Sequence, residues 1–211
     1  MSRTRWRSAR LFAPLLTAVI ALPLFAAAAA AEAAGPPQRP VFTGGEAQPV
    51  FDPDAAVREN LWVRAPVDSD RDGADDEVHV RVVRPAETDR GLRVPVVYNA
   101  SPYFSGGNEV QNHDVDVELY VPRAEMTSRY EDYLLSRGFA VVYAESLGSG
   151  ASTGCPTTGG ENETIGARSV VDWLNGRASA RTGDGDPVHA DWTTGRTAMM
   201  GVSYNGTLPN A

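Results

Sequence analysis

The 211-residue sequence contains only one cysteine, Cys155, so a scaffold of disulfides within the chain is excluded. It also lacks an excess of positive charge, because 19 basic residues stand against 27 acidic ones and the formal net charge is -8. Binding to nucleic acid through neutralised phosphates is therefore not expected. The hydrophobic fraction of 42% is high enough to bury a core, which argues against global disorder.

The first 34 residues have the pattern of a secretory signal peptide. Arg3 to Arg10 form a basic start, Leu11 to Phe25 an apolar core, and Ala26 to Ala34 an alanine-rich stretch with A-x-A cleavage sites. The alternative is an uncleaved anchor, because Leu11 to Ala31 is just long enough to cross a bilayer. We expect cleavage, since alanine adds little insertion energy and two prolines interrupt the run. The composition is typical of a high-GC bacterium, so we expect a secreted bacterial protein that meets a membrane only during export.

The rest of the chain is expected to form a flexible leading segment, residues 35–60, followed by one domain, residues 61–211. Apolar or alternating runs typical of strands alternate there with helical stretches. The expected strands are Glu77–Val83, Val94–Tyr98, Phe139–Ala144 and Arg196–Val202, and the expected helices are Met126–Ser136 and Glu163–Leu174. This alternation indicates an α/β fold with a parallel or mixed sheet.

The last dozen residues carry the pattern on which the functional argument depends. An apolar strand runs into Gly201-Val202-Ser203, and Gly206 follows three residues after the serine. Glycines around a serine at a strand-to-helix turn let the strained turn hold the serine oxygen above the sheet, as in the nucleophile elbow of α/β-hydrolases. The second glycine lies one place later than in G-x-S-x-G. The alternative interpretation is an ordinary turn at the end of a strand.

Several blocks of sequence carry a wider resemblance. They are Asn99–Tyr103, Gly154–Gly160, Val171–Arg177, Val188–Trp192, Gly195–Met199 and Gly201–Leu208. Together they resemble the Xaa-Pro dipeptidyl-peptidases, serine peptidases of the α/β-hydrolase class that are grouped with cocaine-esterase-like acyl hydrolases. The resemblance runs from about Trp62 to Ala211, and the later glycine of the elbow is expected in this group.

The resemblance implies an α/β-hydrolase fold and roles for three residues. Ser203 matches the nucleophile, whose oxygen would attack the scissile carbonyl and form an acyl-enzyme. The backbone N–H of Tyr204 would be one oxyanion-hole donor, and the phenol of Tyr103 would be the second. Without the resemblance, Tyr103 would be interpreted as a packed aromatic in a loop. The expected partner is a peptide substrate, and catalysis needs no cofactor.

The sequence lacks an acid and a histidine after the serine. In α/β-hydrolases these two triad members follow the nucleophile along the chain, but none of the eight residues after Ser203 is Asp, Glu or His. The three histidines, His79, His113 and His189, lie upstream and match no triad position of the family. We therefore expect the N-terminal part of an incomplete α/β-hydrolase domain, with little or no peptidase activity alone.

An acidic run upstream has the D-x-D-x-D-G pattern that begins a calcium loop. In Asp68-Ser69-Asp70-Arg71-Asp72-Gly73, alternate carboxylates could converge on one cation, and Asp76 would stand at the ninth position. His79 occupies the twelfth position, where a bidentate Glu is needed. The alternative is an acidic turn before a strand. Calcium-dependent melting of the wild type, compared with Asp70→Ala, separates a structural calcium site from such a turn.

Three functions stay open at this point. The first is a secreted peptidase that releases dipeptides with proline in second place, a residue whose fixed φ and missing N–H call for a dedicated pocket. The second is an esterase or acylase of the same group, because the elbow and the tyrosine do not depend on the acyl group. The third is a non-catalytic remnant or a calcium-binding secreted domain. The sequence does not indicate an oligomeric state.

Overall fold

The computed structural model describes residues 35–104 and 126–210. The expected signal peptide, its alternative as a membrane anchor, and His113 all lie outside the described residues. Within the two described ranges, no helix has both the length and the apolar character needed to cross a bilayer.

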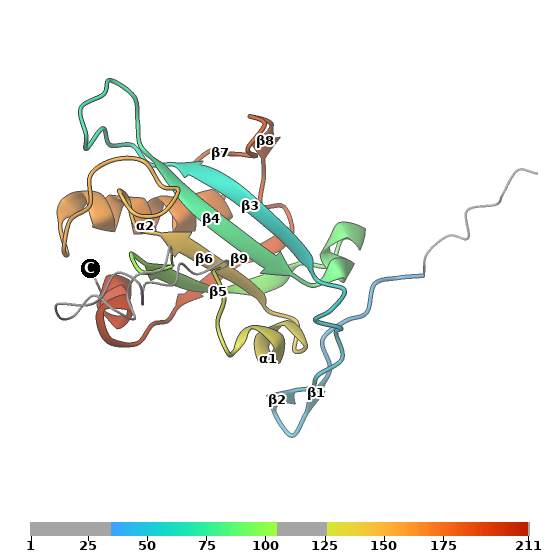
Figure 1. Cartoon of the computed structure of the whole chain (residues 1–211). Helices are drawn as coiled ribbons and strands as arrows, with labels where there is room; N and C mark the ends of the chain where they lie inside the picture. The colour runs from blue at the N-terminus through green and yellow to red at the C-terminus, as the bar shows by residue number, and fades with distance from the viewer. Residues whose placement is uncertain (1–34, 105–125, 211) are drawn as a thin grey trace, which may run out of the picture. The chain divides into compact units, whose positions relative to one another are not determined.

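Seven strands form one mixed sheet in the described part of the chain, in the order β8-β7-β3-β4-β6-β5-β9 (Figure 1). Its strands are β3 (Val57–Arg64), β4 (Glu77–Arg84), β5 (Val94–Ser101), β6 (Ala140–Glu145), β7 (Ala180–Arg181), β8 (Pro187–Val188) and β9 (Thr193–Met199). β5 runs parallel to both β6 and β9, whereas β4 is antiparallel to β3 and β6. The carboxyl ends of β6, β5 and β9 therefore meet at one edge of the sheet.

The central strands are rich in valine because both of their faces are covered. On β6, Ala140, Val142 and Ala144 join one hydrophobic core, and Val141 and Tyr143 join a second one. This alternation follows the two-residue period of a strand. The structure confirms the predicted strands at residues 77–83, 94–98 and 139–144: the first two begin at the predicted residue and end later, and the third is displaced by one residue.

Two helices cover the two faces of the sheet. The helix α2 (Glu161–Leu174) packs Val170, Trp173 and Leu174 into the first core. The short α1 (Glu131–Leu135) adds Leu135 to the second core. The expected helix at residues 126–136 is therefore shortened to 131–135. Three further helical turns in the described residues are 3-10 helices: η1 (Ala86–Arg90), η3 (Ser203–Gly206) and η4 (Leu208–Asn210).

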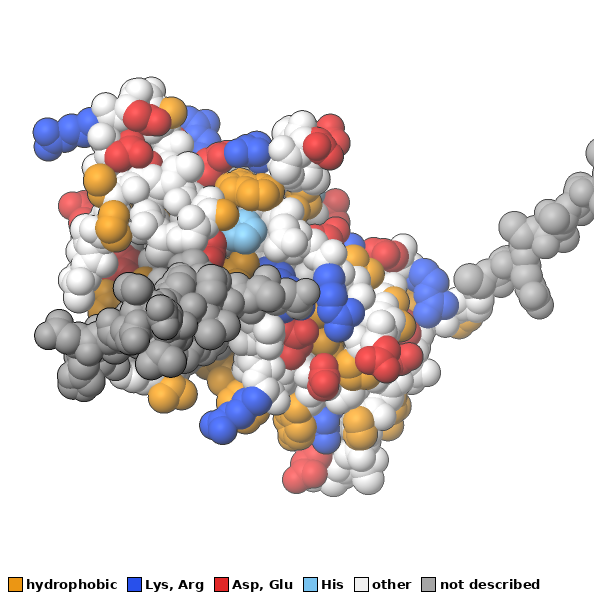
Figure 2. All heavy atoms as spheres, viewed as in Figure 1, with side chains coloured by type: hydrophobic (Ala, Val, Ile, Leu, Met, Phe, Trp, Pro, Cys, Tyr) orange, Lys and Arg blue, Asp and Glu red, His pale blue; other side chains and the backbone are white. Residues whose placement is uncertain are grey.

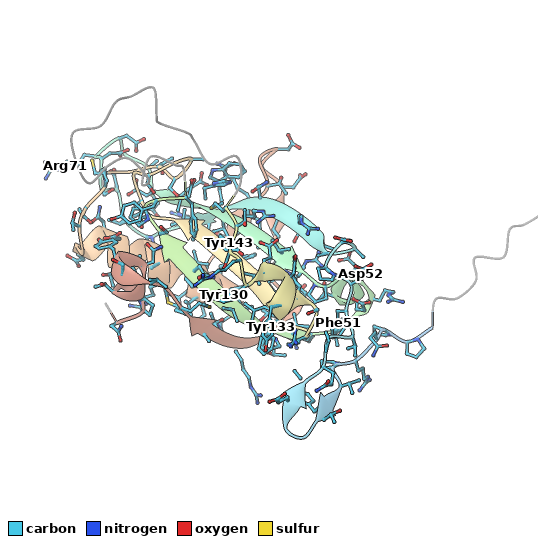
Figure 3. All side chains as sticks on the ribbon, turned by 60° about the horizontal axis from the view of Figure 1, so that its bottom comes forward. Phe51, Asp52, Arg71, Tyr130, Tyr133 and Tyr143 are labelled. Carbon is cyan, nitrogen blue, oxygen red and sulfur yellow. The ribbon has the colours of Figure 1, made fainter. Side chains whose placement is uncertain are left out.

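The leading segment is better ordered than the sequence suggested. Residues 57–60 belong to β3 and pair with β4, so the expected boundary at residue 61 lies inside a strand. Phe51 is buried beside α1 (Figure 3), and its backbone N–H donates to the carbonyl oxygen of Ser136. Farther upstream, β1 (Phe42–Thr43) and β2 (Glu46–Ala47) form a small hairpin. Backbone pairing and one buried aromatic thus anchor residues 50–51 and 57–60 of this segment, whereas flexibility of its remainder stays a prediction.

The last strand also differs from its prediction. The apolar run Arg196–Val202 suggested a strand that reaches Val202, but β9 ends at Met199 and Val202 is 77% exposed. The N–H of Met200 donates to the carbonyl oxygen of Tyr98 at 2.9 Å, next to the last residue pair between β9 and β5. The chain therefore leaves the sheet before Val202 and enters the turn that holds Ser203.

Acidic and basic side chains are interspersed over the face shown in Figure 2. Ion pairs at the protein surface include Arg64 with Asp75 and Arg177 with Asp172. Exposed pairs of this kind contribute little to stability. The buried ion pair between Arg81 and Glu131, at 3.0 Å, instead joins β4 to α1.

Candidate active site

Ser203 has a strained backbone. Its φ is +58°, and among the described residues other than glycine only Arg71 shares a positive φ. L-amino acids seldom adopt this conformation, and it persists where the surrounding structure imposes it, often at functional sites. Ser203 is exposed and directly follows the extended Val202. The structure therefore has the backbone geometry that the sequence predicted for a nucleophile elbow.

The two flanking glycines allow the chain to pass close to itself. A Cβ atom on Gly201 would lie 2.2 Å from the carbonyl oxygen of Asn205. A Cβ atom on Gly206 would lie 3.0 Å from the carbonyl oxygen of Gly201. Contacts at these distances admit only glycine or a shifted backbone at position 201. The spacing G-x-S-x-x-G thus has a direct physical reason here, since the backbones of residues 201 and 205–206 meet.

The two predicted oxyanion-hole residues lie side by side. Tyr103 follows β5, where its N–H donates to the Ser101 hydroxyl at 3.0 Å, and Tyr204 follows Ser203. The ring centroids of Tyr103 and Tyr204 are 6.1 Å apart, with an angle of 59° between the ring planes. Residues a hundred positions apart are brought together because β5 and β9 are parallel neighbours. Their roles as hydrogen-bond donors to a substrate stay predictions.

A buried carboxylate, Glu163, contacts this site and was missed from the sequence. It is 2% exposed and lies in the first turn of α2. Its Oε2 accepts the Tyr204 hydroxyl at 2.5 Å and the Gly159 N–H at 2.8 Å, and its Oε1 accepts the Ser146 hydroxyl at 2.9 Å. The available signal was its position on the helix, seven residues before the buried Val170 and so on the same face.

The environment of Tyr204 keeps its phenol protonated. Burial, followed by the hydrogen bond to Glu163, raises the pKa of Tyr204 to about 12. The hydroxyl is therefore a neutral donor at any physiological pH. It donates to Glu163 and accepts the N–H of Gly159 at 2.8 Å.

Neither described histidine lies beside Ser203. His189 precedes β9, and that strand spans roughly 20 Å before it reaches the elbow end. His79 lies on β4, three strands from β9 and so about 14 Å away across the sheet. Its Nδ1 is 2.8 Å from Oε2 of the buried Glu145, and its ring centroid is 5.0 Å from that of Trp62. Among the described residues, therefore, no histidine lies next to Ser203 to act as its general base.

The acidic loop brings together three of its four predicted ligands. Carboxylate oxygens of Asp68, Asp70 and Asp72 lie within 4.8 Å of one another, and all three residues are exposed. The expectation that Asp76 is the fourth ligand is corrected. Asp76 is 2% exposed, and its Oδ2 accepts both the N–H and the hydroxyl of Ser69 instead of joining the other three. Calcium binding by this loop stays a prediction, and Asp76 is removed from the ligand set.

Comparison with known proteins places these features in a family. A family model described as "X-Pro dipeptidyl-peptidase (S15 family)" matches residues 72–211. The "Putative Xaa-Pro dipeptidyl-peptidase" of Bacillus anthracis is 50% identical over 172 residues, which cover 79% of this chain and 29% of that protein. A protein of the same description from Streptomyces avermitilis is 41% identical over 217 residues, covering 100% of this chain and 30% of the relative. The chain thus spans less than a third of the length of these relatives.

Solved structures with a related arrangement include an alpha-amino acid ester hydrolase and a CocE/NonD family hydrolase from Staphylococcus aureus. The first is 19% identical, with a TM-score of 0.46, and the match covers 73% of this chain and 22% of the ester hydrolase. The second is 17% identical, with a TM-score of 0.47, and the match covers 74% of this chain and 24% of the hydrolase. The mixed sheet and the family match over residues 72–211 carry the assignment: the chain belongs to the X-Pro dipeptidyl-peptidase family of serine hydrolases and holds part of an α/β-hydrolase fold.

Proposed function

We propose that this chain carries the nucleophile-bearing part of a secreted serine peptidase that releases Xaa-Pro dipeptides from the N-termini of peptides. The observation that carries the proposal is the strained φ of +58° at Ser203, in a turn where only glycine fits at position 201. The relatives' description as Xaa-Pro dipeptidyl-peptidases supports the substrate class. Export is supported by the leader sequence, and the N-terminal sequence of the protein recovered from culture medium tests it.

The proposed reaction begins with attack of the Ser203 oxygen on the carbonyl carbon of the proline residue. The negative charge that develops on the carbonyl oxygen would be stabilised by the Tyr204 N–H and the Tyr103 hydroxyl. Collapse of the tetrahedral intermediate breaks the C–N bond and leaves the dipeptide as an ester on Ser203, while the proton taken from Ser203 by the general base passes to the leaving amine. Water then hydrolyses this ester.

The proton on Ser203 must leave during the attack, and this step requires a general base. His79 is engaged with Glu145, and His189 lies at the other end of β9. A serine without a base is a weak nucleophile. Residues 1–211 by themselves are therefore expected to show little or no turnover. A protein that continues to the length of the relatives, called full-length below, is expected to be active.

The second candidate function is that of an esterase or acylase. The proposed nucleophile and the two proposed oxyanion donors would act on any acyl carbonyl. The carboxylate next to them, Glu163, is buried and already accepts three hydrogen bonds, so it is not free to bind a substrate amine. Substrate preference therefore has to be measured.

The test compares three chromogenic substrates with the full-length protein: Ala-Pro-p-nitroanilide, Ala-Ala-p-nitroanilide and p-nitrophenyl acetate. The proposal predicts the highest kcat/KM on the Ala-Pro anilide and its loss in Ser203→Ala. Turnover of the acetate ester alone would establish the esterase alternative. Anilide turnover that survives Ser203→Ala would contradict the assignment of the nucleophile.

A further inference from the structure

Glu163 is an unusual group to bury, because the three donors that contact it from the described part of the chain are all neutral. It is 2% exposed, and its oxygens accept hydrogen bonds from the Ser146 hydroxyl, the Gly159 N–H and the Tyr204 hydroxyl. Taking a carboxylate out of water is costly unless hydrogen bonds compensate it. A glutamate buried to this extent therefore calls for a reason beyond packing.

The donors belong to three separate segments that meet at the elbow. Ser146 follows the end of β6, Gly159 lies in the loop before α2, and Tyr204 is the residue after Ser203. In Figure 1 the last 3-10 turns, in red, lie near α2, in orange. Through its hydrogen bond with Tyr204, the Glu163 carboxylate thus connects the elbow to the first turn of α2, a helix that packs in the core.

We propose that Glu163 is a positioning residue for acyl transfer at Ser203, an inference that rests on the proposed hydrolase function. By holding the Tyr204 hydroxyl, it fixes the Tyr204 side chain and with it the direction of the Tyr204 backbone N–H. It also sets the face that Tyr204 presents to Tyr103, whose ring centroid is 6.1 Å away. Both proposed oxyanion donors therefore depend on one carboxylate that does not touch the substrate.

The hydrogen bond from the Tyr204 hydroxyl to Glu163, called the tether below, is needed because the turn is strained. A backbone held at a φ of +58° relaxes unless its surroundings oppose relaxation. An oxyanion donor is effective only when its hydrogen is held where the charge develops. Tyr204 is only partly buried, so packing alone holds its ring weakly. The hydrogen bond of 2.5 Å to a fixed carboxylate supplies the missing restraint.

The test uses the full-length enzyme and four variants: Glu163→Ala, Glu163→Gln, Tyr204→Phe and the double variant Glu163→Ala/Tyr204→Phe. Glu161→Gln is the matched control, because Glu161 lies in the same helical turn but is exposed. For each protein, kcat and KM are measured on the Ala-Pro anilide and on p-nitrophenyl acetate. The melting temperature and the rate of Ser203 labelling by a fluorophosphonate are also recorded.

Glu163→Ala and Tyr204→Phe are each expected to lower kcat by about 10- to 100-fold, with KM nearly unchanged. The double variant should be no slower than the slower single variant, because both changes break one tether. Glu163→Gln should keep most of the activity. Its amide oxygen can accept the Tyr204 and Gly159 donors, and its NH₂ group can donate to the Ser146 hydroxyl. Glu161→Gln should match the wild type.

The proposal would be overturned if the kcat losses of the two single variants multiply in the double variant. It would also be overturned if Glu163→Gln is as slow as Glu163→Ala. If Glu163→Ala does not fold, Tyr204→Phe decides: a wild-type kcat in that variant excludes the tether. A wild type that hydrolyses only the ester refutes the peptidase specificity but still tests Glu163. A wild type that neither turns over nor becomes labelled at Ser203 refutes both proposals.

Discussion

A Cβ atom on Gly201 would lie 2.2 Å from the carbonyl oxygen of Asn205 and 2.7 Å from the backbone nitrogen of Gly206. Both obstacles are backbone atoms, so no side chain can move aside to make room. The backbone around Ser203 therefore depends on the absence of a side chain two residues before it.

Gly201→Ala is accordingly expected to displace the elbow and to slow fluorophosphonate labelling of Ser203 by at least about 100-fold, since small misplacements of reacting groups have effects of this size. Gly183→Ala is the control, because a Cβ there would meet Trp62 at an ordinary 3.4 Å. Labelling rates are compared by intact-protein mass spectrometry. A Gly201→Ala protein that is labelled as fast as the control would contradict the steric account of the turn.

The second prediction concerns the phenol of Tyr103. Tyr103→Phe keeps the ring next to Tyr204 and removes only the hydroxyl. Removing one oxyanion donor typically lowers kcat by about 100- to 1000-fold, or about 3–4 kcal/mol. We expect such a fall with KM and melting temperature nearly unchanged, measured by steady-state kinetics on the full-length enzyme. An unchanged kcat would return Tyr103 to the role of a packed aromatic.

The third prediction concerns stability in alkali. Burial and the bond to Glu163 raise the pKa of Tyr204 to about 12, whereas an unfolded tyrosine ionises near pH 10. The folded state therefore holds the proton more tightly, so this contribution to stability is complete below about pH 10 and is lost as the pH rises to about 12. Burial raises the pKa of Tyr98 and of Tyr143 in the same direction.

This alkaline effect is measured as the fall in melting temperature between pH 9 and 11.5. Tyr204→Phe should show a smaller fall than the wild type, because phenylalanine has no proton to lose. Tyr133→Phe is the control, since its side chain is exposed. Equal falls in the wild type and in Tyr204→Phe would show that Glu163 does not stabilise the protonated phenol.

The fourth prediction concerns the pair formed by Glu145 and His79. Glu145 is 5% exposed, and its Oε2 accepts the Ala151 N–H at 2.7 Å and lies 2.8 Å from His79 Nδ1. Glu145→Ala leaves both groups without this partner and is expected to cost about 2–4 kcal/mol. Asp75→Ala, which breaks the exposed pair with Arg64, should cost less than about 1 kcal/mol. Similar melting temperatures for the two variants would refute a structural role for Glu145.

Much of the fold could be predicted because its patterns are local. The strands at β4 and β6 and the face of α2 around Val170 and Trp173 follow from apolar periodicity alone. The end of β9 could not be predicted in this way. Val202 continues an apolar run, yet it is 77% exposed, because the chain has to leave the sheet to form the turn at Ser203. Hydrophobicity does not encode that departure.

The site was predicted in part, for a similar reason. Ser203 and its glycines are neighbours in sequence, so their pattern can be recognised. The partners of Glu163 lie 17 and 41 residues away, at Ser146 and Tyr204, and only the folded chain brings them together. Spacing also misled for Asp76, since the calcium pattern counts residues but cannot show that Ser69 occupies this carboxylate.

The central claim is that the hydroxyl at position 203 is the reactive nucleophile of the enzyme. The most direct measurement treats the full-length protein and its Ser203→Ala variant with a fluorophosphonate and locates the adduct by peptide mass spectrometry. The account predicts one adduct, on the peptide that contains Ser203, and no adduct in the variant. An adduct on another serine, or identical labelling of both proteins, would contradict it.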